Sequence, residues 1–471
     1  MSSAFHYSTI SRLTAGIRSK KISPVEVVDA ALDRISECDG RLNSFSHFDR
    51  DTARRQALYA QAAAQRGDNL GPLHGIPLTI KSNIDVAGWH CPAGSTLRKD
   101  YVAQQDGTLV ARLKAAGAIL LGNTNTPEFL MAYESSNLLN GRTSNPWDLT
   151  RTAGGSSGGE AAAISSGCSA GGVGSDGGGS IRVPAHFCGI CGLKPTPGRV
   201  PSTGHFPPGA GLLNWLGVVG PMARTIADVR TLFAVMAGPD PGDALSAPVP
   251  LEPTADPKTV AGLRVGLLES DALAKPTPET EAAVKRAASF LQTQGMLVEP
   301  FKLSGLDRAL EIWWFFFGPL VEYLFRPTVE GHMDQISPIL REYLAYAASE
   351  KPVTMDEVID NCSQRDIVRA EILRQVQNVP ILLSPVSAKP AFRHGEGTYR
   401  LGEDQCYRET MRHSQWLNLA GFPGATVPVG CSPEGLPIGV QVIGRPHEEE
   451  LVLNVAEQIE QARGPWQPPP L

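Results

Sequence analysis

Apolar residues along the chain follow two patterns, short unbroken runs and positions dispersed among charges. The run AILLG at residues 118–122 predicts a buried strand, and LRVGLL at 263–268, VPILLSPV at 379–386 and GLPIGVQVIG at 435–444 predict further strands. Residues 279–294 instead set Ala283 and Leu291 among charged neighbours, which predicts an amphipathic helix. Alternation of such helices and strands is typical of an α/β fold whose sheet is covered on both faces.

The N-terminal part adds helical signals to this pattern. Ser23 and Glu26 form an S-x-x-E capping box with Pro24 at the first helical position, so we expect a helix over residues 23–39 that ends at Gly40. Residues 51–65 predict a second helix and residues 108–116 a third. GIPLTIKSNID, residues 75–85, predicts a short strand that runs into a loop, with Lys81 at its end.

Composition and charge narrow the class of protein. The 471 residues, 42% hydrophobic and 19% charged, are those of a globular chain, and length alone suggests about three domains. A net charge of −6 gives no basic stripe, so we expect no nucleic-acid partner. Eight scattered cysteines and an N-terminus without the apolar core of a signal peptide indicate a cytoplasmic protein. Residues 237–260 are Pro-rich and either separate domains or bridge two halves of one sheet.

The longest apolar stretch, residues 312–325 (IWWFFFGPLVEYLF), is too short to span a bilayer, and Gly318, Pro319 and Glu322 interrupt it. We therefore expect no membrane span. The stretch is most simply a core or pocket wall. A hydrophobic substrate channel, a contact in a homodimer and a cap lying on a membrane remain open, and its aromatic part, Trp313–Phe317, has no assigned role.

The Gly- and Ser-rich segment 153–180 carries several short motifs. Residues 172–177 fit GxGxxG but lack the strand and helix of a dinucleotide site. Residues 154–158 fit the GxSxG nucleophile elbow, which would need His394 or His413 as its base. Cys188 and Cys191 form a CxxC without a second half, and the histidines show no ligand spacing, so we expect neither a cofactor nor a metal. A third possibility joins Lys81 to serines of this segment, because Lys can replace His as the base of a serine nucleophile.

A resemblance decides among these possibilities. GIPLTIKSNID, then GGSSGGEAAA, then GSDGGGSIRVPAHFCGICGLKPT resembles the amidase signature family, as do SNPWDLTRTAGGSSGG and the C-terminal LAGFPGATVPVG and GLPIGVQVIG. The resemblance implies one large α/β/α domain, residues 71–465, with a central mixed, mostly parallel twisted sheet. It also implies an N-terminal helical segment, residues 1–70, packed on this core, and a variable substrate-lining insert at about residues 300–400.

The family's pattern also assigns roles to residues. Ser180 corresponds to the nucleophile, Ser156 to the bridging serine behind a cis peptide bond, and Lys81 to the base. Gly177, Gly178 and Gly179 correspond to the oxyanion hole, and Ser157, Asp176 and Arg182 to residues that orient this glycine loop. Leu130 and Met131 correspond to the acyl side of the pocket. The chain departs from the pattern at Gly177, where Thr is usual, and at Ser82, where Asp is frequent.

The resemblance implies an amidase that cleaves the carbon–nitrogen bond of a carboxamide through an acyl-enzyme. The aromatic run favours aryl or hydrophobic acyl amides, with esters and carbamates also open. We therefore expect a small-molecule substrate. One alternative is the glutaminase component of a tRNA-dependent amidotransferase, disfavoured because the region after residue 300 shows no polar pattern suited to glutamine. The other is a membrane-associated enzyme similar to fatty acid amide hydrolase, or a lipid-binding protein.

Overall fold

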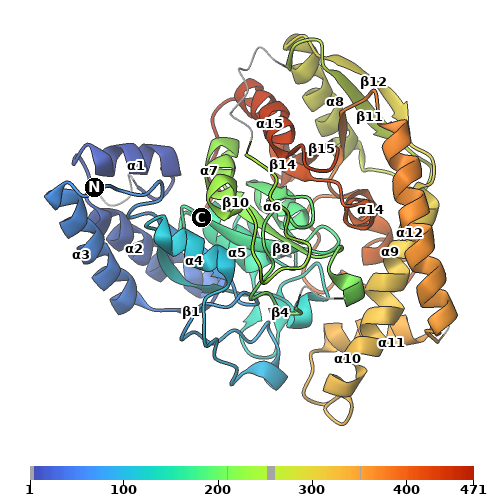
Figure 1. Ribbon diagram of the computed structural model, residues 1–471, viewed down its shortest axis with the longest axis horizontal. Helices are drawn as coiled ribbons and strands as arrows, with labels where there is room; N and C mark the ends of the chain where they lie inside the picture. Colours follow the sequence, from blue (N-terminus) through green and yellow to red (C-terminus); the bar gives the residue numbers. More distant parts are fainter. Residues whose placement is uncertain (1–4, 209–210, 252–259, 351) are drawn as a thin grey trace.

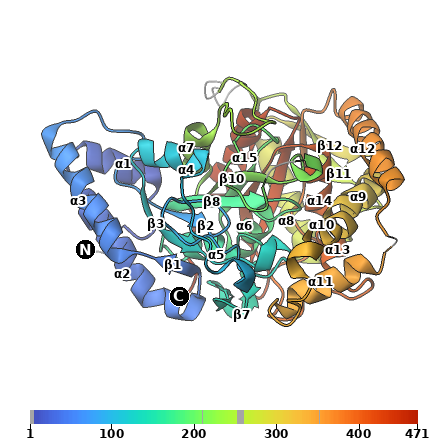
Figure 2. The same cartoon turned by 60° about the horizontal axis from the view of Figure 1, so that its bottom comes forward.

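The computed structural model describes residues 5–208, 211–251, 260–350 and 352–471. Its centre is an eleven-stranded sheet (Figures 1 and 2). In spatial order the strands are β1 (Phe45–Phe48), β3 (Ile119–Thr124), β2 (Pro77–Lys81), β8 (Gly171–Asp176), β10 (Val218–Ala223), β9 (Cys191–Lys194), β14 (Gly424–Cys431), β15 (Pro437–Gly444), β13 (Ile381–Pro385), β11 (Arg264–Glu269) and β12 (Leu297–Lys302). Two small hairpins pair β4 (Ser136–Asn137) with β5 (Gly141–Arg142) and β6 (Ser144–Asn145) with β7 (Asp148–Thr152).

The sheet is mixed, as expected, but it is not mostly parallel. Four of its described neighbouring strand pairs are parallel, β3–β2, β2–β8, β13–β11 and β11–β12, and the other six are antiparallel. An apolar run predicts a buried strand but does not set its direction. The turn at residues 432–436 makes β14 and β15 a hairpin, which only antiparallel strands can form.

Helices cover both faces of the sheet. Alternate residues of β13 point into two different cores: Ile381 and Leu383 pack in one, and Leu382 packs in the other. The helices are α1 (Ile10–Arg18), α2 (Pro24–Leu42), α3 (Arg50–Arg66), α4 (Thr108–Ala115), α5 (Gly158–Ser165), α6 (Arg182–Cys188), α7 (Ile226–Met236), α8 (Pro278–Thr293), α9 (Leu306–Phe315), α10 (Val321–Val329), α11 (Pro338–Ala348), α12 (Met355–Gln375), α13 (Tyr407–Thr410), α14 (Arg412–Ala420) and α15 (Glu449–Arg463).

The first core joins the sheet to α7, α8 and α15, and the second joins it to α9–α14. A smaller cluster lies between α5 and α6. Figure 1 shows α1–α3 in blue at one end of the molecule and α9–α12 in yellow and orange at the other. A π-helical turn, Phe316–Leu320, connects α9 to α10. Most of the apolar stretch 312–325 is buried in the second core, which agrees with its simplest interpretation.

Helix α2 shows how local sequence sets an element. The Ser23 side chain accepts from the Glu26 N–H, and the Glu26 carboxylate accepts from the Ser23 N–H, so the predicted capping box is present. The predicted end at Gly40 is wrong. The helix continues to Leu42, which is fully buried, and ends at Asn43 in the left-handed conformation. Of the Pro-rich stretch 237–260, residues 252–259 lie outside the described residues.

Candidate active site

Lys81 is the last residue of β2 and lies between β3 and β8. Its side chain is fully buried. Burial lowers the pKa of Lys81 well below its ordinary value, although the charges of Asp176 and Glu160 oppose this. A lysine in such surroundings holds a neutral amine that can accept a proton.

The predicted serine lies directly against this amine. Lys81 Nζ is 2.6 Å from Ser156 Oγ, and the Gly155–Ser156 peptide bond is cis, as expected. Lys81 Nζ also donates to Ser175 Oγ at 3.0 Å. Ser175 lies inside the GSDGGGS string that carries the resemblance, but the sequence did not predict it as a residue of the site. The position of Lys81 at a strand end therefore brings two serines from separate segments to one amine.

Ser180 lies in the turn before α6, beside the same group. The Ser157 N–H donates to the Ser180 carbonyl at 3.1 Å and ties the two serine segments together. Ser157 Oγ donates to the Ser175 carbonyl at 3.2 Å. Ser156 and Ser180, which the resemblance selected, line one cavity together with Ser175. Lys81 lies behind Ser156, in contact with its hydroxyl.

Asp176 and Arg182 form an ion pair that anchors the glycine loop, Gly177–Gly179. Burial disfavours ionisation of Asp176, yet the Arg182 guanidinium, 2.9 Å away, keeps the pKa of this carboxyl well below its usual range. The carboxylate accepts from the Gly179 N–H at 2.7 Å and from the Ile181 N–H at 3.1 Å. This corrects one expectation, because a Gly179 N–H bound to a carboxylate is not free to bind an oxyanion.

The N–H groups of Gly177, Gly178 and Ser180 remain without an acceptor among the described residues. These three are therefore the available donors of the loop. The sequence could not show that the Gly179 N–H differs from the N–H groups of Gly177, Gly178 and Ser180. The difference arises only because the Asp176 side chain turns toward Gly179.

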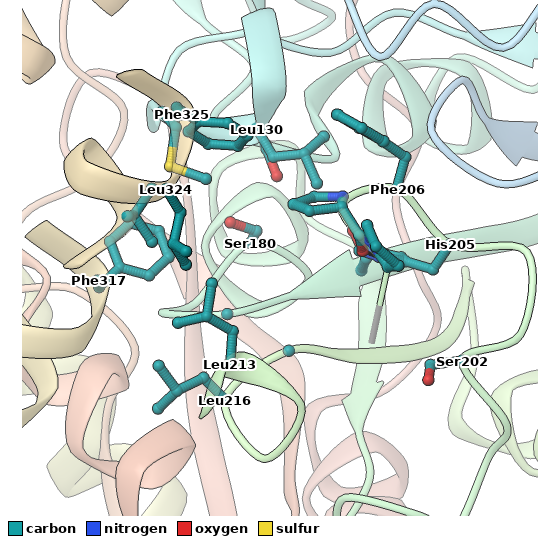
Figure 3. A pocket seen from close by; sticks show the side chains of 18 of the residues that line it. Leu130, Ser180, Ser202, His205, Phe206, Leu213, Leu216, Phe317, Leu324 and Phe325 are labelled. Carbon is teal, nitrogen blue, oxygen red and sulfur yellow. Dashed lines mark hydrogen bonds between the residues drawn. The ribbon is translucent and has the colours of Figure 1, made fainter. Parts of the chain in front are cut away.

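The cavity beside Ser180 measures about 450 Å³ and is mostly apolar. Figure 3 shows Phe317, Leu324 and Phe325 on one side of Ser180, with Phe206 and His205 on the other. Leu213 and Leu216 lie nearby. The structure also places Leu130 and Met131 in the wall, and whether they bind substrate stays a prediction. Tyr323 and Leu324 of α10 are 53% and 50% exposed, which leaves apolar surface beside this wall.

Glu160 of α5 is a further buried group that the sequence did not reveal. Thr79 and Thr124 donate to its two carboxyl oxygens. Burial raises the pKa of Glu160 to about 8, against these two hydrogen bonds and the charge of Lys81. An acidic residue in the helix-forming string EAAAIS gives no sign of burial, because the burial arises from packing of α5 on β2 and β3.

The histidines required by a nucleophile elbow lie elsewhere. His394 Nδ1 is 2.9 Å from Glu134 Oε1, and His413 Nε2 is 2.8 Å from the Ala274 carbonyl. Cys188 and Cys191 are buried free thiols. The serine of the GxSxG string, Ser156, therefore has Lys81 beside it instead of a histidine.

Comparison with known proteins accounts for this arrangement. The family model described as Amidase matches residues 26–453. The chain belongs to the amidase signature family. Its expected fold and its class, an amide-hydrolysing enzyme, follow from that match and from similar solved structures.

A curated relative is the A subunit of glutamyl-tRNA(Gln) amidotransferase from Roseiflexus sp. (strain RS-1), 36% identical over 481 residues, with 96% of each chain covered. Among solved structures, a chain of a vestigial protein complex that reveals the evolutionary origins of an s-triazine catabolic enzyme superposes with a TM-score of 0.89 at 29% identity, covering 98% of this chain and 100% of that one. 6-Aminohexanoate cyclic dimer hydrolase complexed with substrate gives 0.86 at 27% identity, with 98% of each chain covered.

These relatives contradict the expected partners. We expected a small-molecule substrate and no nucleic acid, whereas the name of the curated relative states a tRNA and describes one component of an assembly. The net charge of −6, on which that expectation rested, does not exclude a complex in which a different component contacts nucleic acid. No helix in the described part of the chain is long and apolar enough to cross a bilayer.

Proposed function

We propose that this amidase cleaves its substrate through an acyl-enzyme on Ser180. Ser180 Oγ attacks the amide carbonyl carbon, its proton passes to Ser156 Oγ, and the Ser156 proton passes to the neutral amine of Lys81. When the carbon–nitrogen bond breaks, Ser156 gives a proton to the leaving nitrogen and Lys81 replaces it. Water then attacks the ester in the same way, and the carboxylic acid leaves. The 2.6 Å contact between Lys81 Nζ and Ser156 Oγ supports this relay.

In this mechanism the N–H groups of Gly177, Gly178 and Ser180 stabilise the tetrahedral oxyanion. They lie in the loop that carries Ser180 and are not used by other described acceptors. Two or three backbone donors aimed at one point are the usual arrangement for this charge. Asp176 holds the loop through Gly179 and Ile181, which supports an orienting role for Asp176 and Arg182.

We infer that the acyl part of the substrate is apolar, and the cavity carries this inference. Phe317, Leu320 and Leu324 line it on one side and Leu213 and Leu216 on another. The only charged side chain in its described lining is Asp176, which is paired with Arg182. Such a wall favours a hydrocarbon or aryl group over a free amino acid, since charged groups lose hydration there without gaining a partner.

The curated relatives favour a second candidate, the glutaminase component of a tRNA-dependent amidotransferase. They match over nearly the full length of both chains, and the relay proposed for Ser180 would serve glutamine equally. In that case partner proteins would be needed and the released ammonia would be passed on. This candidate has the better support from similarity, and the apolar cavity supports the first.

One experiment separates the two candidates. Purified protein is given octanoyl p-nitroanilide and, separately, glutamine, with Ser180→Ala as the control. The first candidate predicts hydrolysis of the anilide that is lost in Ser180→Ala, with glutamine inert. Glutamine hydrolysis that appears or rises when the other components of an amidotransferase are added, with the anilide inert, would instead establish the second.

Two further expectations accompany the proposal. We propose that residues 71–465 form one folding unit against which the segment 1–70 packs, with residues 300–400 as the part that determines the substrate. We also propose a cytoplasmic location, which is consistent with the scattered free cysteines.

A further inference from the structure

The oxyanion loop, Asp176–Ser180, contains three successive glycines, and glycine peptide units rotate easily. In a trans peptide the carbonyl of one residue and the N–H of the next point in opposite directions. A donor that fixes a carbonyl on one side of the loop therefore aims the following N–H toward the other side. The donors that bind the carbonyls of the loop therefore determine where its free N–H groups point.

Two aromatic side chains hold carbonyls in the middle of this loop. Trp313 Nε1 donates to the Gly177 carbonyl at 2.9 Å, and this fixes the direction of the Gly178 N–H. The Tyr133 hydroxyl donates to the Gly178 carbonyl at 2.6 Å, and this directs the Gly179 N–H toward Asp176. Both aromatic side chains are buried.

Close packing reinforces these two hydrogen bonds. A Cβ atom at Gly178 would lie 2.5 Å from Trp313 Cζ2 and 2.9 Å from the Tyr133 hydroxyl, so the loop fits these rings only with glycine there. The Phe317 ring stacks on Trp313 with centroids 4.6 Å apart. It also fills the space beside Gly177, where a Cβ would lie 3.2 Å from Phe317 Cε2. Gly177, which departs from the family's usual Thr, thus leaves room for the aromatic run.

We propose that Trp313 and Tyr133 are positioning residues of the oxyanion loop. Trp313 aims the Gly178 N–H at the substrate oxyanion, and Tyr133 holds the next peptide unit so that the Gly179 N–H stays on Asp176 and the loop keeps its shape. The inference rests on the proposed acyl-enzyme function of Ser180. It gives the aromatic run Trp313–Phe317 two roles at once, since Phe317 lines the acyl cavity while Trp313, stacked on it, holds the loop that binds the oxyanion. An acyl group that packs against Phe317 therefore also supports the Trp313 ring stacked on it, and Trp313 orients the Gly178 N–H.

The test uses substitutions that remove a single donor. Trp313→Phe keeps an aromatic ring but loses Nε1, and Tyr133→Phe loses only the hydroxyl. Trp314→Phe is the matched control, because Trp314 is equally buried but its Nε1 donates to Glu350 at 3.2 Å instead of to the loop. Thermal unfolding of each variant shows whether the fold is kept.

We expect kcat for octanoyl p-nitroanilide to fall on the order of tenfold to hundredfold in Trp313→Phe and in Tyr133→Phe, with KM nearly unchanged. Affinity for octylboronic acid, which forms a tetrahedral adduct on a nucleophilic serine, should fall in parallel. Affinity for octanol, which only fills the cavity, should not change, and Trp314→Phe should behave as wild type.

The inference is overturned if the two variants lose octanol and octylboronic acid affinity equally, or if their kcat equals that of Trp314→Phe. Wild-type protein that neither hydrolyses the anilide nor binds the boronic acid would overturn the proposed function itself. That outcome is distinct, because it does not depend on either aromatic substitution.

Discussion

In the proposed relay, Lys81 must be neutral before it can take a proton from Ser156. Because burial holds the pKa of Lys81 well below its ordinary value, kcat/KM should rise with pH and reach its plateau well below pH 10.5. The measurement is a pH profile of octanoyl p-nitroanilide hydrolysis. Lys81→Met should lower kcat at least about a thousandfold, on the order of the loss seen when a triad member is removed. A rising limb centred near pH 10.5 would show a lysine of ordinary pKa and contradict the assignment.

Asp176 and Arg182 form a fully buried ion pair on which the loop depends. Arg182→Met leaves the Asp176 carboxylate buried and unpaired, so we expect the free energy of unfolding to fall by about 3–5 kcal/mol. Urea denaturation measures this. The double variant Asp176→Asn with Arg182→Met should be less destabilised than the single one, and equal losses would show that the pair is not coupled.

The same pair gives a pH dependence of stability. The folded pKa of Asp176 lies below its unfolded value, so its contribution is complete above the unfolded pKa and is lost as pH falls toward the folded one. We therefore expect wild type to lose stability below about pH 4. Asp176→Asn should lose less over the same range, and an identical loss in both proteins would contradict the shift.

At the scale of elements, α9, the π-helical turn and α10 form one wall of the cavity. Phe317→Ala removes a ring that lines the cavity, and we expect kcat/KM for octanoyl p-nitroanilide to fall at least about tenfold, from lost apolar contact. Tyr323→Ala on α10, at an exposed position, is the control and should change little. The loss for an acetyl anilide should be smaller, and equal losses for both chain lengths would exclude an acyl-binding role for Phe317.

Elements were predictable where a local signal determines them. Ser23, Pro24 and Glu26 set the start of α2 through contacts within four residues, and Lys81 ends its strand as expected. The end of α2 was missed because burial of Leu42 extends the helix past Gly40. The roles of Tyr133 and Trp313 were also out of reach, because their partners are 45 and 136 residues away in the chain.

At the scale of the whole molecule, the sheet unites segments from residue 45 to residue 444. Because α9–α14 share a core with β11, β13 and β15, we expect the chain to unfold in one cooperative transition. Tryptophan fluorescence and far-ultraviolet circular dichroism should give coincident urea curves. Curves that do not coincide would mean that part of the chain unfolds separately and would contradict a single cooperative unit.

The α/β class and the covered sheet followed from the alternation of apolar runs and amphipathic helices. Strand direction did not, because β10 pairs antiparallel with both β8 and β9 although a long Gly- and Pro-rich segment, not a short hairpin turn, joins it to β9. Convergence of Lys81, Ser156 and Ser180 was expected from a resemblance in three motifs. The available oxyanion donors were only partly expected, because the Asp176 side chain removes Gly179 from the set.

The central claim is that an apolar acyl group is transferred to Ser180. The most direct measurement is mass spectrometry of the protein quenched in acid during turnover of p-nitrophenyl octanoate, followed by peptide mapping. We predict the added mass of one octanoyl group on the peptide that contains Ser180, and no added mass in Ser180→Ala. An octanoyl group on any other residue, or turnover that persists in Ser180→Ala, would contradict the claim.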